Sequence, residues 1–282
     1  MAEQAIKHYE HDYFLEGSEE SSRLSNQHEI IKDAMGRLVL APIEFSNSPL
    51  KILDSGTADG TWIRDLAAST APVRHEFYGT DINPAEFPAE VPDGTTYQAQ
   101  DINKPWPSDW RDRFDFVHQR LVLVGSGSKQ HEALQSLGRL VKPGGWIQLI
   151  EATNKYPSTG CGPKMHAFID LTISVFQQMG ADLKVGDNLP LWLEKEGFTD
   201  IKHFDIEMKM GAQNPDKELA RRGVFSMSIA TRGLTQFAKT FEPGKCSLSA
   251  EQLDSLPSEL DEELKTIGGL YPIRVIWGRK TT

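Results

Sequence analysis

The chain has little cysteine, no long apolar run and no run of basic residues. Its 282 residues include two cysteines, Cys161 and Cys246, which are too few for a disulfide framework and are typical of a reducing compartment. No apolar stretch approaches the roughly 20 residues that span a bilayer, and the first residues are too polar for a secretory signal. These absences predict a soluble cytoplasmic protein without a membrane partner.

Charge argues against a nucleic-acid partner. The chain carries 30 basic and 40 acidic residues, for a net charge of −10. A broad basic surface is therefore not expected. His131, His166 and His203 stand singly, without the close spacing of a metal site, so no metal is predicted.

Residues 51–60 combine an apolar run, an acid and a turn of small residues, in the sequence KILDSGTADG. Small side chains let the backbone turn sharply and approach a ligand, and the helical sequence from Trp62 onward places a helix N-terminus beyond the turn. The three glycines of a dinucleotide-binding loop are incomplete, because Ala58 takes the middle position. The pattern predicts a nucleotide-binding turn whose ligand is not a pyrophosphate.

Two later strand-like segments also end in acids. Residues 76–81 form an apolar strand that closes on Asp81, and residues 97–102 form a shorter one that closes on Asp101 beside an apolar residue. An acid at the end of the second strand can accept hydrogen bonds from ribose hydroxyls. An adenine ring can lie beside the third strand, so that three strand ends line one crevice.

These residues resemble the class I S-adenosylmethionine-dependent methyltransferases. The matching positions are Asp54, Gly56, Gly60, Asp81, Asp101 and Ile102. The chain departs from the family at Ala58, where glycine is usual and an added methyl group narrows the space beside the cofactor. A fourth strand at 113–118 and a Lys-Pro-Gly-Gly turn before a fifth strand, within residues 139–151, extend the resemblance.

Segments outside this region narrow the resemblance to fungal methyltransferases of natural-product gene clusters. They are residues 16–28, residues 38–43, the element Val117-His118-Gln119-Arg120 and the ending Gly278-Arg279-Lys280. The resemblance implies S-adenosyl-L-methionine as cofactor and methyl transfer to oxygen, nitrogen or sulfur of a small, apolar natural-product intermediate. The cofactor contacts that it implies are Asp54, Gly56, Thr57, Ala58, Gly60, Asp81, Ile82, Asp101, Ile102, His118 and Arg23.

Methyl transfer from a sulfonium is an in-line displacement, so the protein mainly aligns the reactants and excludes water. Asp54 can pair with the ammonium group of the cofactor or hold the turn through backbone N–H groups. His118 can contact the cofactor or act as a general base for a hydroxyl acceptor, and a purely structural role is also open. An acceptor pocket needs apolar walls with a few polar anchors. The candidates for it are Tyr13, His28, Met165, Phe168, Ile169 and Trp192.

The predicted fold is α/β: a Rossmann-like, seven-stranded, mostly parallel sheet with helices on both faces, together with an N-terminal and an inserted helical cap. Residues 1–48 form the N-terminal cap or lid, and residues 49–282 form the methyltransferase domain with a helical insertion at about 211–268. Further expected elements are a mobile strip at 16–22, helices at 28–40, 164–179, 189–197, 217–241 and 249–267, and strands at 198–208 and 271–278, the last one antiparallel.

Two other functions stay open beside that of a methyltransferase. The fold can catalyse a rearrangement or cyclisation in which the sulfonium acts only as fixed charge, and the mass of the product separates this reaction from methyl transfer. A non-catalytic regulator with a protein partner is the other alternative, and Ala58 is the one feature that favours it. A homodimer is also open, because the N-terminal cap can dock on a second subunit or on its own crevice.

Overall fold

The computed structural model describes residues 18–153, 155–157 and 159–281. The strands are β1 (Lys51–Ser55), β2 (Glu76–Asp81), β3 (Thr95–Ala99), β4 (Phe114–Arg120), β5 (Val141–Ala152), β6 (Phe198–Met210) and β7 (Gly269–Lys280). The α-helices are α2 (Ser18–Met35), α3 (Thr61–Ser69), α4 (Gln130–Gly138), α5 (Pro163–Gln178), α6 (Val185–Lys195), α7 (Lys217–Ala238) and α8 (Ala250–Thr266). Short 3-10 helices are η1 (Pro84–Glu86), η2 (Ser108–Trp110), η3 (Leu123–Lys129) and η4 (Gly211–Gln213).

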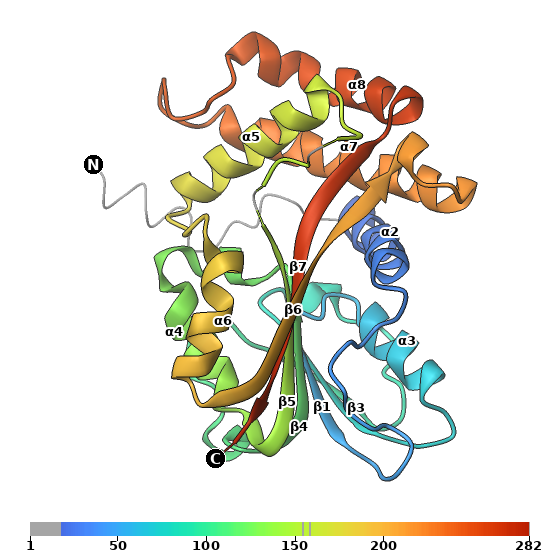
Figure 1. Cartoon of the computed structure of the whole chain (residues 1–282), viewed down its shortest axis with the longest axis vertical. Helices are drawn as coiled ribbons and strands as arrows, with labels where there is room; N and C mark the ends of the chain where they lie inside the picture. Colours follow the sequence, from blue (N-terminus) through green and yellow to red (C-terminus); the bar gives the residue numbers. More distant parts are fainter. Residues whose placement is uncertain (1–17, 154, 158, 282) are drawn as a thin grey trace. The chain divides into compact units, whose positions relative to one another are not determined.

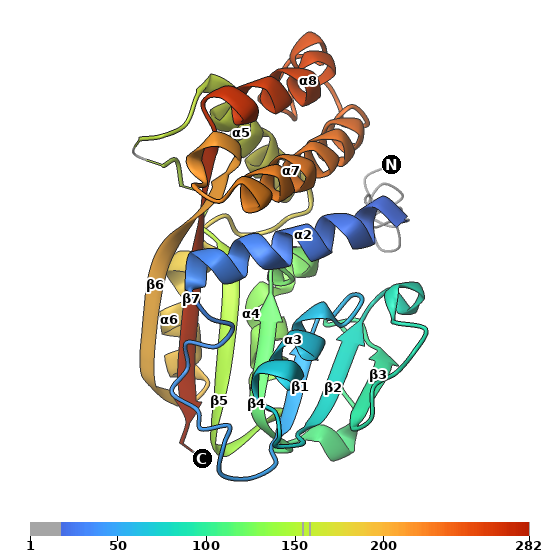
Figure 2. The same cartoon turned by 90° about the vertical axis from the view of Figure 1, so that its right-hand side faces the viewer.

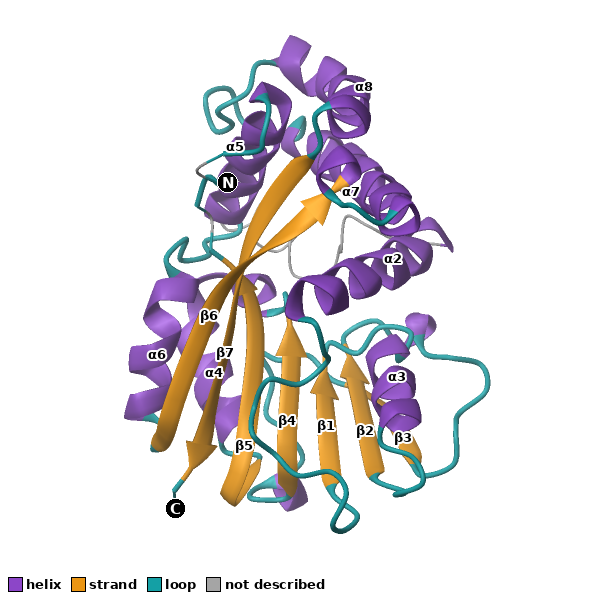
Figure 3. Ribbon diagram, turned by 45° about the vertical axis from the view of Figure 1, so that its right-hand side comes forward, coloured by secondary structure: helices purple, strands orange, loops and turns teal. Residues whose placement is uncertain are grey.

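The strands form one sheet in the order β3-β2-β1-β4-β5-β7-β6 (Figure 3). β1 pairs in parallel with β2 and β4, β2 with β3, and β4 with β5, whereas β7 runs antiparallel to β5. The order reverses between β1 and β4, which is where ligands bind in open α/β sheets. The predicted Rossmann-like class and the antiparallel seventh strand are confirmed.

The chain divides into two compact units. The sheet unit comprises Lys32–Asn154, Ala181–Glu207 and Pro272–Thr282. The helical unit comprises the described residues up to Ile31, together with Lys155–Gly180 and Met208–Tyr271. The predicted boundaries of a cap at residue 48 and an insertion at about 211–268 stay predictions.

The core of the sheet unit follows from the alternation of side chains along its parallel strands. Leu53 and Val117 face one side of the sheet, where they pack with α4 and α6 in a large apolar cluster. Their neighbours Ile52 and Phe116 are fully buried, and Trp62 of α3 packs against Phe116 with ring centroids 6.3 Å apart. Figure 1 shows α3 and the α4–α6 pair on opposite sides of the sheet.

The helical unit has its own contacts. Helices α5, α7 and α8 pack against one another (Figure 2). Its buried side chains include Met165 and Leu171 of α5, Met227 of α7 and Leu260 of α8. Within the described residues no helix has the length and apolar character needed to cross a membrane.

Several predicted boundaries are wrong. Helix α2 begins at Ser18, so residues 18–22 are helical and not a mobile strip, and it ends at Met35 because Gly36, with φ 69°, ends it before the predicted Leu40. Strand β3 ends at Ala99, which leaves Asp101 in the following turn.

The expected Lys-Pro-Gly-Gly turn is also wrong, because residues 142–145 lie inside β5. The register between β4 and β5 shifts there, between Phe114 and Phe116, which indicates an irregularity of the β-bulge type. Helix α6 starts at Val185 and not at Leu189, since Pro190 is tolerated inside it.

Candidate cofactor site and active site

The turn after β1 has an unusual backbone and is tied to the end of β2. Gly56, Ala58 and Gly60 all have positive φ, at 74°, 48° and 72°. The N–H groups of Gly56 and Thr57 donate to the carbonyl of Thr80 at 2.7 and 2.9 Å. The positive φ values at Gly56 and Gly60 favour the glycines that the sequence pattern singled out.

Ala58 adopts a conformation that glycine reaches without strain. A left-handed backbone costs an alanine about 1–2 kcal/mol. Its N–H donates to Oδ2 of Asp81 at 2.9 Å, so the turn closes on the acid of β2 although the usual glycine is missing. The departure from the family pattern leaves the shape of the turn intact.

Asp81 and Ile82 lie together at the carboxyl edge of β2. Oδ1 of Asp81 accepts the N–H of Asn83 at 3.0 Å. Burial raises the pKa of Asp81, although the backbone N–H groups of Asn83 and Ala58 oppose that effect. Ile82 is 57% exposed, so its apolar side chain is accessible to a ligand. An acid beside an exposed apolar surface suits a ribose and the base attached to it.

Asp101 and Ile102 follow β3. Oδ1 of Asp101 accepts the N–H of Asn103 at 2.8 Å, which stabilises the turn. Ile102 is partly buried and packs against the apolar cluster of the sheet unit. Both residues therefore have structural contacts, and their contact with adenine stays a prediction.

Asp54 of β1 and His118 of β4 form a buried pair. The strand register places them side by side, and Oδ1 of Asp54 lies 2.7 Å from Nδ1 of His118. Their exposed fractions are 3% and 1%. The ring of His118 also stacks on Trp62, with centroids 4.0 Å apart and planes 2° apart.

The environment of His118 sets its proton state. Burial lowers its pKa, and the hydrogen bond to Asp54 opposes this without reversing it, so the ring is neutral. The carboxylate accepts a hydrogen bond, so Nδ1 carries the proton and Nε2 has a free lone pair. Among the described residues Nε2 has no hydrogen-bond partner. The geometry is that of an oriented base.

Three polar residues, Ser55 of β1, Gln119 of β4 and Glu151 of β5, lie on the face of the sheet opposite to Asp54 and His118. Oγ of Ser55 donates to Oε1 of Gln119 at 3.0 Å. Glu151, which is 2% exposed, accepts the N–H groups of Val122 and Leu123 at 3.3 and 3.1 Å on Oε1. Burial raises the pKa of Glu151 to about 7. The sequence analysis missed Glu151, although an acid at the end of a predicted fifth strand is a signal of the same kind as Asp54 and Asp81.

The remaining candidates are divided between the two units. Tyr13 lies outside the described residues. Arg23, predicted to bind the cofactor, is on α2 in the helical unit and pairs with Glu20 at 2.7 Å, with both side chains buried. Trp192 belongs to α6 in the sheet unit and stacks on His131, with centroids 5.2 Å apart.

The other acceptor candidates belong to the helical unit. Met165, Phe168 and Ile169 are buried on α5, and Phe168 contacts Tyr271 with ring centroids 6.0 Å apart. His28 is buried on α2. A role in acceptor binding stays a prediction for all four residues.

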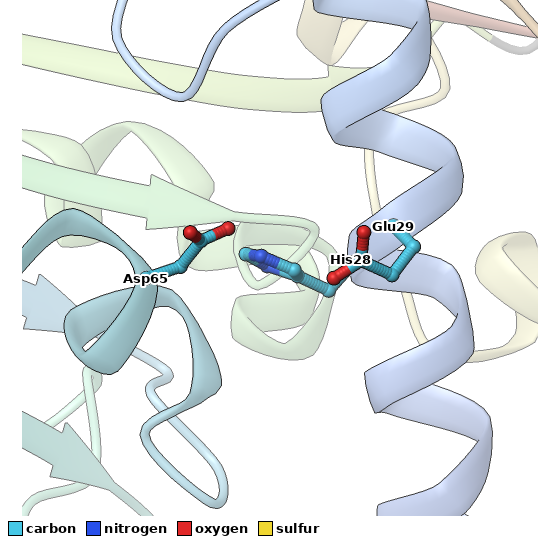
Figure 4. A group of neighbouring side chains, drawn as sticks. All are labelled: His28, Glu29 and Asp65. Carbon is cyan, nitrogen blue, oxygen red and sulfur yellow. The ribbon is translucent and has the colours of Figure 1, made fainter. Parts of the chain in front are cut away.

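Figure 4 shows His28 and Glu29 on α2 and Asp65 on α3. His28 and Glu29 belong to the helical unit and Asp65 to the sheet unit, so we do not combine them into a metal site. Within the sheet unit Asp65 pairs with Nζ of Lys32 at 2.5 Å. The absence of a metal stays a prediction.

The strand order, the turn after β1 and the acid after β2 define a class I methyltransferase. The chain belongs to the methyltransferase domain family, whose model matches residues 26–203. It is an enzyme that uses S-adenosyl-L-methionine as methyl donor, and the predicted class and cofactor are confirmed.

Two fungal relatives match nearly the whole chain. N-methyltransferase sirN of Leptosphaeria maculans is 35% identical over 96% of this chain and 95% of its own length. N-methyltransferase gliN of Aspergillus fumigatus is 33% identical over 93% of this chain and 94% of its own length.

A solved structure shares the fold. It is phosphoethanolamine N-methyltransferase 2 of Haemonchus contortus with phosphomonomethylethanolamine and S-adenosylhomocysteine. The TM-score is 0.51 at 15% identity, and the match covers 92% of this chain but 53% of that one. This chain therefore spans about half the length of that enzyme.

The residues present fit the cofactor. The turn of Gly56–Gly60 has positive φ at Gly56, Ala58 and Gly60 and carries small side chains, and Asp81 and Ile82 offer a carboxylate and an exposed apolar surface. Oγ1 of Thr57 and Nε2 of His118 are buried polar atoms without partners among the described residues. Such atoms usually have a ligand or a water molecule to bind.

Proposed function

We propose that the enzyme methylates a nitrogen atom of a small, apolar natural-product intermediate. The observation that carries the proposal is the buried Asp54–His118 pair, with a free lone pair on Nε2 of His118. The names of the two fungal relatives support nitrogen over oxygen and sulfur. An amide or heterocyclic nitrogen loses a proton when it is methylated, as a hydroxyl or thiol does, so a base suits this acceptor, and the names of the relatives favour nitrogen among the three.

When bound, S-adenosyl-L-methionine supplies a methyl group that is already activated by a sulfonium. The Gly56–Gly60 turn, Asp81 and Ile82 would hold it, and Asp101 and Ile102 would frame its base. His118 accepts the proton of the acceptor nitrogen at Nε2 as the new N–C bond forms. Asp54 holds Nδ1–H and stabilises the positive charge that the ring then gains.

The test offers the enzyme and the donor a panel of small apolar acceptors. The panel contains matched amides, heterocycles, alcohols and thiols, and products are analysed by fragmentation mass spectrometry. We expect one added CH2, located on nitrogen. Methylation of alcohols or thiols alone would overturn the nitrogen assignment. A product of unchanged mass would favour the rearrangement, and cofactor binding without turnover would favour the regulator.

We further propose that the enzyme is cytoplasmic and binds no nucleic acid, and that it is a monomer or a homodimer. The net charge of −10 supports the second of these. Light scattering of the purified enzyme distinguishes a monomer from a dimer, and a shift assay at low salt would reveal nucleic-acid binding.

A further inference from the structure

One residue, Val122, lies between Glu151 and the turn of Gly56–Gly60. Oε1 of Glu151 accepts the N–H groups of Val122 and Leu123, at the start of the segment that follows β4. The side chain of Val122 packs on Gly56, where an added Cβ would lie 2.2 Å from Cγ2 of Val122. The contacts therefore run from the end of β5, through the turn after β4, to the turn after β1.

No cation neutralises Glu151 within the described residues. The strand register places Arg274 of β7 directly opposite it, on the same face of the sheet. The guanidinium of Arg274 instead donates to Asp205 at 2.5 and 2.7 Å, to the carbonyl of Gly186 at 2.8 Å and to Asp187 at 3.1 Å. On β4, Gln119 shares the face of Glu151, and the ionisable His118 points to the other face.

The two backbone hydrogen bonds alone do not call for an acid. The carbonyl oxygen of a glutamine would accept both N–H groups without burying a charge. A buried carboxylate without a cation is costly, and its pKa accordingly rises to about 7. The two hydrogen bonds therefore do not explain why this position carries an acid in place of an amide.

We propose that Glu151 is a specificity-determining residue, whose carboxylate favours the cationic methyl donor over the neutral product at the turn of Gly56–Gly60. The donor carries a sulfonium, whereas S-adenosylhomocysteine carries a neutral thioether. A charge within about 10 Å, at an effective dielectric constant of about 20, changes affinity on the order of tenfold. Product release is then favoured as soon as the methyl group has left. The inference rests on the methyl donor and is independent of the acceptor proposed above.

The test compares the dissociation constants of S-adenosyl-L-methionine and S-adenosylhomocysteine for the wild type and for Glu151→Gln, by calorimetry at pH 8. The two ligands share their adenosine and amino-acid parts, so the ratio of the constants isolates the charge on sulfur. In Glu151→Gln we expect the donor to bind about tenfold more weakly, with the affinity for the product changed by less than about twofold.

The control is Asp115→Asn, which removes an equal charge from β4 at a position whose carboxylate binds the N–H of Lys51 and the side chain of Lys142. In Asp115→Asn the ratio of the dissociation constants of S-adenosyl-L-methionine and S-adenosylhomocysteine should match the wild-type ratio. A ratio that falls as much in Asp115→Asn as in Glu151→Gln would overturn the assignment to Glu151.

The wild type provides a second measurement that does not depend on folding of a variant. Between pH 6 and 8 the preference of the wild type for the donor over the product should rise as Glu151 ionises. In Glu151→Gln the ratio of the two dissociation constants should not change with pH. Burial lowers the pKa of His118, and Glu151→Gln keeps that ring, so any contribution of His118 to the pH dependence appears in the variant as well. A flat ratio in the wild type, or an equal loss of both ligands in Glu151→Gln, would refute the proposal.

Discussion

At the scale of single residues, Asp54 has two competing roles. Its Oδ1 holds Nδ1 of His118 at 2.7 Å, whereas the resemblance to methyltransferases implies a contact with the ammonium group of the cofactor. The two roles affect different steps. Orientation of a base affects turnover, and an ammonium contact affects cofactor binding.

Replacement of Asp54 by Asn separates these roles. The Asn amide can donate to Nδ1, which moves the ring proton to Nε2 and removes the base. We expect kcat to fall by about 100-fold or more, with the dissociation constant of the donor changed by less than about threefold. Rapid-quench kinetics and calorimetry measure the two quantities. A weakened donor with unchanged kcat at saturation would assign Asp54 to the ammonium group instead.

The sequence indicated both members of this pair but not their contact. Asp54 and His118 were assigned from motifs 64 residues apart in the chain, and only the parallel register of β1 and β4 brings them together. The stacking of Trp62 on His118 was beyond prediction for the same reason. It depends on how α3 packs on the sheet, which no local pattern encodes.

At the scale of elements, the start of α5 depends on a side chain from α8. Gly162 at the N-cap offers no side-chain acceptor, and Pro163 follows it. Glu263 of α8 accepts the N–H groups of Lys164 and Met165 at 2.9 and 2.7 Å. A Cβ on residue 162 would lie 2.3 Å from this carboxyl group, so the glycine leaves room for a cap supplied from elsewhere.

Replacement of Glu263 by Ala should destabilise the start of α5. It leaves two buried N–H groups without an acceptor, which costs about 2–3 kcal/mol. Hydrogen exchange at the amides of Lys164 and Met165 measures the loss of protection. Glu259→Ala is the matched control, because Glu259 is one turn earlier on α8, pairs with Nζ of Lys164 and accepts the hydroxyl of Ser255, but accepts no backbone N–H of α5. Exposed ion pairs of this kind contribute little to stability. Equal losses in both variants would contradict the capping role.

Elements were predicted best where local patterns are strong. The apolar run of β2 gave its bounds, 76–81, correctly, and the periodic α5 was placed within one residue. Errors fell where a distant contact decides the conformation. Gly144 lies inside β5, although the local sequence Pro-Gly-Gly is typical of a turn. Residues 142–145 form the irregularity in the pairing with β4, which continues from Val141 to Trp146 on either side of them.

At the scale of the whole molecule, the helical unit shows what a linear reading misses. It assembles the described residues up to 31 with 155–180 and 208–271, whereas the sequence analysis treated the N-terminal cap and the insertion as separate additions. Their association depends on packing among α5, α7 and α8, which arises from contacts far apart in the chain.

Buried ionisable groups of the sheet unit influence folding in opposite directions as pH changes. Burial lowers the pKa of His118, so the unfolded chain binds a proton more readily and stability falls below about pH 6.5. Burial raises the pKa of Glu151 from 4.5 to about 7, so the folded protein binds its proton more readily. The stability from that proton is complete below about pH 4.5 and is lost as pH rises through 7.

The dependence of wild-type stability on pH contains the effects of both His118 and Glu151. A comparison with Glu151→Gln isolates the effect of Glu151. The variant keeps an oxygen that accepts the N–H groups of Val122 and Leu123 but has no proton to lose. Its free energy of unfolding should therefore rise relative to that of the wild type by up to about 3 kcal/mol between pH 4.5 and 7. Urea denaturation of both proteins at half-unit steps of pH measures the difference. A difference that stays constant over this range would mean that Glu151 ionises in the folded protein as it does in the unfolded chain, and that its charge carries no burial cost.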